Sequence, residues 1–189
     1  MINRSNYMHT LIQTIDKDYV KLLVGVRRSG KSTLLKMLQL YLINNGIAKN
    51  RIIEINFEMI EYDFLKDKEN IHQYIKERVS NDDKHYLFID EVQEIPEWAR
   101  IVNSLKVSMN LDIYVTGSNA RVFSGEHLTY LAGRYISINV YPLMYQELIE
   151  FLKLEKDFSK QYNLFLDSSF PAVVLESNKE IKEIMKQDM

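Results

Sequence analysis

Gly25-Val26-Arg27-Arg28-Ser29-Gly30-Lys31-Ser32 is the most informative stretch of this 189-residue sequence. Two glycines separated by four residues and followed by Lys and Ser match the pattern of a phosphate-binding P-loop. The context agrees with the pattern, because an apolar run at 21–24 leads into the loop and a leucine-rich segment leads out of it. In such a loop the backbone N–H groups and the N-terminus of the following helix converge on phosphate. The alternative is a glycine turn in front of a helix, with Lys31 solvated.

The P-loop pattern also predicts what individual residues do. The Lys31 ammonium would neutralise the β- and γ-phosphates of a nucleotide, and the Ser32 hydroxyl would bind Mg²⁺. The nucleotide-binding residues predicted from the sequence are Gly25, Arg27, Arg28, Ser29, Gly30, Lys31, Ser32 and Thr33. The Asn-Lys-x-Asp signature that reads guanine is absent, which argues against a GTPase.

Two acidic residues follow a second apolar run. Asp90 and Glu91 come directly after Tyr86-Leu87-Phe88-Ile89, and the carboxyl ends of parallel strands form the edge of the sheet where ligands bind. Asp90 is therefore the predicted metal ligand, and Glu91 the predicted base that orients and deprotonates the attacking water. The alternative is that both acids only cap a following helix, since acids are favoured at helix N-termini.

A third run, Ile113 to Val115, is followed by the polar residues Thr116-Gly117-Ser118-Asn119. An amide or hydroxyl at this edge would hold the attacking water and sense the γ-phosphate, and we predict Asn119 in this role in preference to Ser118. A turn made of good turn formers is the competing interpretation.

Arg134 follows Leu131-Ala132-Gly133 and is the last catalytic candidate. It would reach phosphate as an arginine finger, either in its own chain or in a neighbouring one. An ordinary surface arginine is the alternative.

Short apolar runs alternate with longer helical patterns along the chain. The expected strands are Val20 to Gly25, Arg51 to Phe57, His85 to Asp90, Leu111 to Thr116 and Tyr135 to Val140, and the clearest helices are Lys31 to Asn45 and Glu97 to Met109. Alternation of this kind predicts parallel strands joined by crossover helices. The expected fold class is α/β, a three-layer P-loop NTPase fold with a five-stranded, mainly parallel sheet flanked by helices and followed by a short helical segment.

The pattern becomes entirely helical from about Tyr145. We therefore expect an ATPase core at 1–142 and a helical extension at 143–189, the truncated start of a second domain.

Composition excludes several functional classes. The absence of cysteine excludes disulfides and thiolate chemistry, and no apolar run approaches the ~18 residues of a membrane-spanning helix. No signal peptide is recognisable, so a soluble, cytoplasmic protein is expected. A formal net charge of -2 gives no electrostatic indication of nucleic-acid binding.

Several of these segments together resemble a known family, the predicted AAA-domain ATPases of bacteria and archaea, a branch of the AAA+ and related P-loop ATPases. The segments are Val24 to Thr33, Phe88 to Pro96 with Trp98, Thr116 to Asn119, Leu131 to Arg134, and Tyr141-Pro142-Leu143 with Glu147, within about Asn3 to Leu152. The resemblance implies a five-stranded core in which the strand Leu111 to Thr116 lies between the P-loop strand and the acidic strand. It also implies Mg-ATP, the roles given above for Lys31, Ser32, Asp90 and Glu91, a sensor role for Asn119 and a functional role for Arg134. Members of the family normally continue into a C-terminal domain, which would begin near Phe170-Pro171.

The leading hypothesis is an ATPase whose hydrolysis of ATP drives a conformational change in a protein partner or an attached domain. An ATP-dependent switch without turnover is the second hypothesis, and a nucleic-acid motor is the third. The expected partners are ATP, an unidentified protein and, if Arg134 acts across subunits, further copies of the same chain. Small-molecule kinase activity remains open.

Overall fold

The computed structural model describes residues 4–79, 83–118, 125–145, 147, 148, 181, 182 and 185. It contains one five-stranded sheet in the order β2-β3-β4-β1-β5, and each neighbouring pair is parallel. The strands are β1 (Val20–Val24), β2 (Ile52–Asn56), β3 (His85–Asp90), β4 (Leu111–Gly117) and β5 (Tyr135–Asn139). The predicted α/β P-loop fold is therefore confirmed, and each strand ends within one residue of its expected limits.

Strand β4 lies between β1 and β3, as the family resemblance implied. The three central strands are buried along their whole length, whereas the edge strands β2 and β5 are partly exposed. Because the strands are parallel, the carboxyl ends of β1, β3 and β4 meet at one edge of the sheet. This arrangement brings together three chain segments that are far apart in the sequence.

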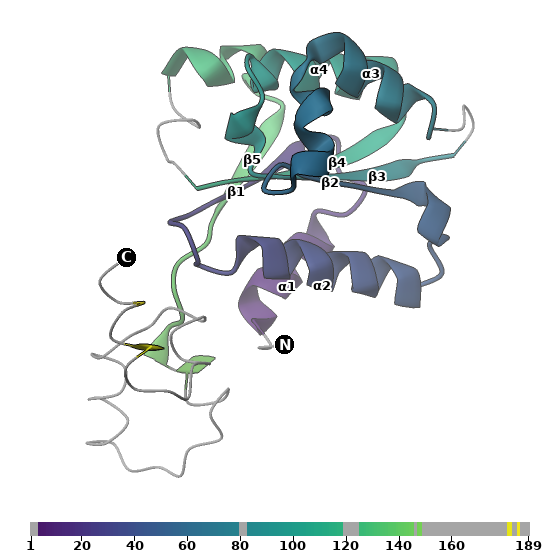
Figure 1. Ribbon diagram of the computed structural model, residues 1–189. Coiled ribbons are helices and arrows are strands. Elements are labelled where there is room, and N and C mark those ends of the chain that lie inside the picture. The colour runs from purple at the N-terminus through teal and green to yellow at the C-terminus, as the bar shows by residue number, and fades with distance from the viewer. Residues whose placement is uncertain are drawn as a thin grey trace.

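Helices cover both faces of the sheet (Figure 1). One face carries α1 (Ser5–Gln13) and α2 (Lys31–Asn44), and the other carries α3 (Lys68–Lys76) and α4 (Trp98–Ser108). Short 3-10 helices in the described connections are η1 (Lys49–Arg51), η2 (Ile60–Lys66), η3 (Val92–Glu94) and η5 (Gly125–Leu131). The predicted helices at 31–45 and 97–109 are confirmed, with ends shifted by one residue at most.

Two hydrophobic cores result from this layering. Side chains alternate across each strand, so Leu22 belongs to the core beneath α3 and α4, and Leu23 to the core beneath α1 and α2. In the second core, Leu34 and Leu38 of α2 are fully buried, at the spacing of one helical turn. The helix ends at Asn44, and Gly46 adopts the left-handed conformation expected there, with a φ of 91°.

A network of buried polar groups lies near the amino ends of the central strands. Lys21 of β1 is fully buried, and its ammonium donates hydrogen bonds to Asp112 of β4 and to the Lys17 carbonyl at 2.8 Å. Asp112 also accepts hydrogen bonds from the Asp16 N–H at 2.9 Å and the Tyr114 hydroxyl at 3.0 Å. Burial lowers the pKa of Lys21, and the Asp112 carboxylate acts in the opposite direction. This network is at the opposite edge of the sheet from the P-loop.

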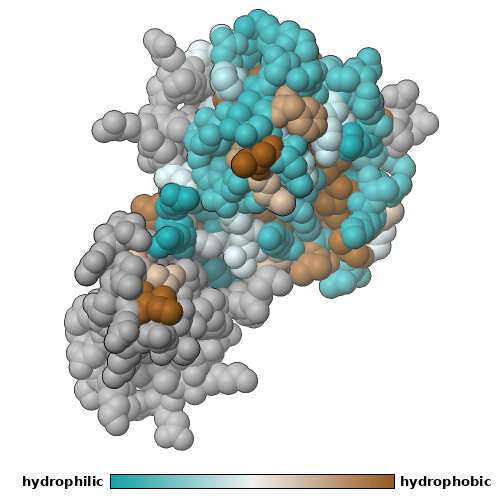
Figure 2. Space-filling view, in the orientation of Figure 1, coloured by the Kyte–Doolittle hydropathy of each residue, from teal (hydrophilic) through white to brown (hydrophobic). Residues whose placement is uncertain are grey.

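Membrane-spanning helices are long and apolar. None of the helices in the described part of the chain has the length and apolar character needed to cross a bilayer. The face shown in Figure 2 is covered mainly by hydrophilic residues, with hydrophobic residues exposed in small groups.

The predicted extension at 143–189 lies mostly outside the described residues. Tyr145, Glu147 and Leu148 are helical, and the Leu148 N–H donates a hydrogen bond to the Met144 carbonyl at 2.9 Å. A domain boundary near Pro142 stays a prediction.

Candidate nucleotide-binding site

The P-loop occupies residues 25–30, between the end of β1 and the start of α2. Arg28 and Gly30 have left-handed backbones, with φ of 64° and 95°. No side chain caps the N-terminus of α2, and the first N–H groups of a helix have no partner within it. These N–H groups therefore face the loop, as a cradle for an anion requires.

Gly25 is fixed by a close approach of the backbone that follows β5. A Cβ atom at Gly25 would lie 2.1 Å from the Val140 carbonyl oxygen. The same segment is bonded to β1, because the Val140 N–H donates a hydrogen bond to the Val24 carbonyl at 2.6 Å. The first residue of the loop must therefore be glycine for steric reasons alone.

Lys31 is buried, with an exposed fraction of 3%, so the solvated alternative is wrong. Its ammonium donates hydrogen bonds to the carbonyls of Gly25 and Val26, both at 3.0 Å, and to the Ser118 hydroxyl at 3.1 Å. Burial lowers the pKa of this ammonium, and the carboxylates of Glu91 and Asp90 oppose that effect. Because burial disfavours the charged form of Lys31, a bound phosphate would stabilise that charge.

Asp90 ends β3 and is 5% exposed. Its carboxylate accepts a hydrogen bond from the Thr116 hydroxyl at the end of β4. The same Thr116 oxygen accepts a hydrogen bond from the Glu91 N–H at 3.0 Å. Thr116 thus fixes both acidic residues of the candidate site, one by its side chain and the other by its backbone.

Glu91 has a left-handed backbone, with a φ of 57°, which is uncommon for a residue other than glycine. Its carboxylate accepts hydrogen bonds from the Ser118 hydroxyl at 2.6 Å and from the Gln93 amide. Although Glu91 occupies the position before η3, its side chain makes no capping hydrogen bond. Strained backbone that is held by several neighbours is typical of functional sites.

Ser118 links the P-loop to the acidic strand. It accepts a hydrogen bond from Lys31 and donates one to Glu91, so three residues from three chain segments form a continuous chain of hydrogen bonds. All three side chains lie at the carboxyl edge of the sheet. The geometry therefore brings together the predicted phosphate-binding lysine and the predicted catalytic carboxylate.

A cavity of about 270 Å³ opens beside this chain of hydrogen bonds. It is lined by Arg27, Phe57, Glu58, Glu91, Gln93, Glu94 and Ser118. Arg27 contributes a positive charge from the P-loop, which would counter the charge of a phosphate in a cavity otherwise rich in carboxylates.

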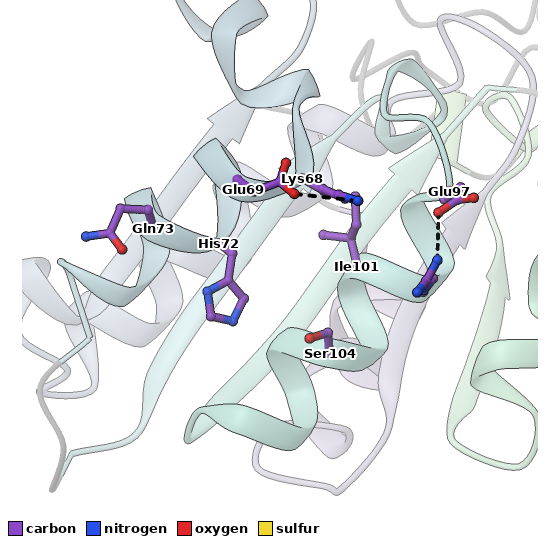
Figure 3. A pocket seen from close by; sticks show the side chains of 8 residues that line it. Lys68, Glu69, His72, Gln73, Glu97, Ile101 and Ser104 are labelled. Atoms are coloured by element: carbon purple, nitrogen blue, oxygen red, sulfur yellow. Dashed lines mark hydrogen bonds and ion pairs between the residues drawn. The ribbon is translucent and has the colours of Figure 1, made fainter.

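A larger cavity, about 520 Å³, lies between α3 and α4 and contains no P-loop residue. Figure 3 shows its charged groups paired with one another, Lys68 with Glu69 and Glu97 with Arg100. We assign the candidate site to the smaller cavity, because only that one combines P-loop, Glu91 and Ser118 side chains.

The residues present fit a magnesium nucleotide. The Ser29 hydroxyl oxygen is buried in the P-loop and has no hydrogen-bond partner among the described groups. Ser32 is half-buried in the first turn of α2, beside Lys31. A hydroxyl and one carboxylate, here Ser32 and Asp90, are the kind of ligand set that Mg²⁺ uses together with phosphates. Arg28 and Thr33 are exposed at the rim of the loop.

One predicted residue, Arg134, lies away from this site, and a second cannot be placed. Asn119 lies outside the described residues. Arg134 immediately precedes β5, and its carbonyl accepts a hydrogen bond from the Val20 N–H at the amino end of β1. The length of β1, ~15 Å at ~3.3 Å per residue, therefore separates Arg134 from the P-loop. A functional role for Arg134, in its own chain or toward a neighbouring one, stays a prediction. The Arg134 guanidinium donates a hydrogen bond to Asn103 at 3.3 Å.

Sequence reasoning gave no specific role to Thr116 and preferred Asn119 to Ser118. Thr116 could have been singled out by its position at the end of a strand next to β3. Ile89 pairs with Val115, so the residues that follow them, Asp90 and Thr116, lie side by side. The sequence analysis also missed Arg4, whose guanidinium donates a hydrogen bond to the Ser29 carbonyl of the P-loop. The sequence around Arg4 contains no motif that predicts this contact.

Comparisons with known proteins identify the family of the chain and proteins of similar fold. A family model described as AAA domain matches residues 17–149. The chain therefore belongs to this AAA-domain family. An uncharacterized protein of Haemophilus influenzae is 42% identical over 188 residues, which cover 97% of this chain and 47% of that protein. The uncharacterized protein MJ1544 of Methanocaldococcus jannaschii is 31% identical, with coverage of 89% and 39%.

Among solved structures, the Walker-type ATPase PABY2304 of Pyrococcus abyssi has a TM-score of 0.54 and 16% sequence identity, covering 92% of this chain and 65% of its own. This likeness concerns the fold. The chain spans less than half the length of each of the two curated relatives.

Proposed function

We propose that this chain binds Mg-ATP at the P-loop and hydrolyses it, and that hydrolysis drives a conformational change in a protein partner or an attached domain. The observation that carries the proposal is the chain of hydrogen bonds from Lys31 through Ser118 to Glu91. It supports a direct link between the group that would hold phosphate and the group that would activate water.

Each residue has a defined part in the proposed reaction. Lys31 and the N–H groups of the P-loop would hold the β- and γ-phosphates, and Ser32 and Asp90 would hold the metal. Bound Mg²⁺ would supply charge stabilisation for the departing phosphate. Glu91 would orient a water and accept its proton, and Ser118 would sense whether the γ-phosphate is present.

The second candidate is a switch that binds ATP with negligible turnover. The observation that favours it is that both oxygens of Glu91 already accept hydrogen bonds, one from Ser118 and one from Gln93. A carboxylate held in this way must first be released before it acts as a base.

Phosphate release from Mg-ATP, measured for the purified chain and for Glu91→Gln, separates the two candidates. We expect the wild-type chain to release phosphate and Glu91→Gln to lose at least about 100-fold of that rate, the order contributed by a general base, while still binding nucleotide. Glu94→Gln is the matched control, because Glu94 lines the same cavity but pairs with Lys66 at 3.6 Å. Equal rates for wild type and Glu91→Gln would contradict the assigned base, and binding without release would favour the switch.

The dependence of the rate on protein concentration bears on Arg134. A rate per chain that rises with concentration, and is lost in Arg134→Ala, would support an action of Arg134 on the nucleotide of a neighbouring copy.

A further inference from the structure

Arg4, the residue before α1, joins three segments of the chain through one guanidinium group. It is buried, with an exposed fraction of 3%. Its Nη1 donates a hydrogen bond to the Ser29 carbonyl of the P-loop at 2.7 Å. Its Nε and Nη2 donate to the two carboxylate oxygens of Glu147 at 2.9 and 3.1 Å, and Nη2 also donates to the Tyr141 carbonyl at 2.8 Å. The planar, forked shape of guanidinium suits this set of acceptors.

On the P-loop side, Arg4 binds the carbonyl of the peptide between Ser29 and Gly30, in the last turn of the loop. Ser29 is followed by Gly30, whose left-handed backbone leads directly into Lys31 and α2. The other end of the loop, Gly25, packs against Val140. The P-loop is therefore supported at both ends, by Arg4 and by the segment that follows β5.

On the other side, Glu147 holds Arg4 and contacts the segment 140–148, of which the structure describes 140–145, 147 and 148. Glu147 is 9% exposed, and its carboxylate also accepts a hydrogen bond from the Met144 N–H at 2.9 Å. A buried charge needs its partner, so the guanidinium and the carboxylate hold each other in place. A separate contact joins this segment to α1, because the Tyr141 N–H donates a hydrogen bond to the Tyr7 hydroxyl at 3.1 Å.

We propose that Arg4 is a positioning residue for the P-loop, held by Glu147, and that it couples nucleotide binding to the docking of residues 140–148 on the core. A ligand that fixes the Ser29 peptide favours the docked segment, and the docked segment favours the ligand by the same factor, because such coupling is reciprocal. The second half of this inference rests on the proposed function. The first half, the support of the P-loop, is independent of it.

Hydrogen exchange without nucleotide tests the first half. Arg4→Lys keeps the charge for Glu147 but removes the fork that reaches Ser29 at the same time. We expect amides of residues 26–32 to exchange about tenfold faster in this variant, the effect of losing one charge-assisted hydrogen bond. Tyr7→Phe is the matched control, since it frees the same segment at Tyr141 without touching the P-loop, and its P-loop exchange should equal that of wild type.

Equilibrium binding of Mg-ATP tests the coupling. We expect the Kd to rise about tenfold in Arg4→Lys and in Glu147→Gln. The Kd of the double variant should be no higher than the higher of the two single-variant values, because both substitutions act through the same contact. In the wild-type chain, Mg-ATP should slow amide exchange at 143–148, and in Arg4→Lys it should not.

The outcomes are distinct. Unchanged P-loop exchange in Arg4→Lys, with only a lower melting temperature, would show a purely structural ion pair and overturn the inference. If the wild-type chain binds no Mg-ATP but its P-loop exchange still depends on Arg4, the positioning role stands and the proposed function fails. Additive effects of Arg4→Lys and Glu147→Gln on Kd would overturn the coupling. Should Arg4→Lys fail to fold, Glu147→Gln, which is isosteric, gives the same exchange readout.

Discussion

A single methyl group at Gly25 would collide with backbone, and backbone yields less readily than a side chain. We expect Gly25→Ala to lower the free energy of unfolding by about 1–3 kcal/mol, the usual cost of overpacking, and to weaken nucleotide binding because the loop must shift. Urea unfolding and Mg-ATP titration would measure the two effects.

Gly46→Ala provides the comparison for this prediction. Gly46 also has a demanding position, with a φ of 91°, but no atom lies within 4 Å of the Cβ that it would gain. Its substitution should therefore cost stability through backbone strain and leave nucleotide binding unchanged. Unaltered stability and binding in Gly25→Ala would show that the segment after β5 is displaced easily.

The sequence predicted most of the residues that meet at the candidate site but not all of the contacts between them. Lys31 and Glu91 were predicted because a loop pattern and the end of an apolar run specify them with little reference to the rest of the chain. The contact of Ser118 with Lys31 could not be predicted from sequence, because Ser118 is a good turn former and only the tertiary environment directs its side chain.

The strands were predictable because the central ones are buried on both faces and read as continuous apolar runs. Helix α1 carries no comparable signal. Leu11 is its one fully buried residue, and Arg4, which precedes its first turn, makes no side-chain capping hydrogen bond. The local sequence therefore contains no signal that predicts where this helix begins.

Strand β3 contains a tyrosine whose ionisation should be visible in stability at high pH. Burial, with the nearby Asp16 carboxylate, raises the pKa of Tyr86 to about 12. Because the folded pKa lies above the unfolded value of 10.0, the protonated form favours folding. This contribution is complete below pH 10 and is lost as the pH rises toward 12, at up to ~1.4 kcal/mol per pH unit.

Tyr86→Phe should therefore have a shallower loss of stability between pH 10 and 12 than the wild-type chain, measured by urea unfolding at each pH. Tyr19→Phe is the control, because Tyr19 is 44% exposed. Equal slopes of unfolding free energy against pH in the wild-type chain and Tyr86→Phe would show that the fold does not raise the pKa of Tyr86.

Nucleotide binding should stabilise the folded chain as a unit. At a free concentration ~100 times the Kd, Mg-ATP would add about 2.7 kcal/mol, or roughly 5 to 10 °C in melting temperature at this size. Thermal unfolding with and without Mg-ATP measures the shift, and chelation of the metal should reduce it. An equal shift in Lys31→Ala would contradict the assignment of the P-loop as the binding site.

The order of the strands was expected from the family resemblance, not from the strand patterns, which specify no neighbours. Neither the family resemblance nor the strand patterns could predict contacts between distant segments. Arg4 and Glu147 are separated by 143 positions, and their pairing depends on the path of the chain across the sheet. The extent of the helical extension stays a prediction, since most of 143–189 lies outside the described residues.

The pairing of Arg4 with Glu147 also bears on how this core combines with other domains. Since the two side chains touch, positions 4 and 147 lie side by side although the whole sheet lies between them in the sequence. A unit with adjacent entry and exit points is suited to insertion into another polypeptide, and to circular permutation with a short linker, without stretching its sheet.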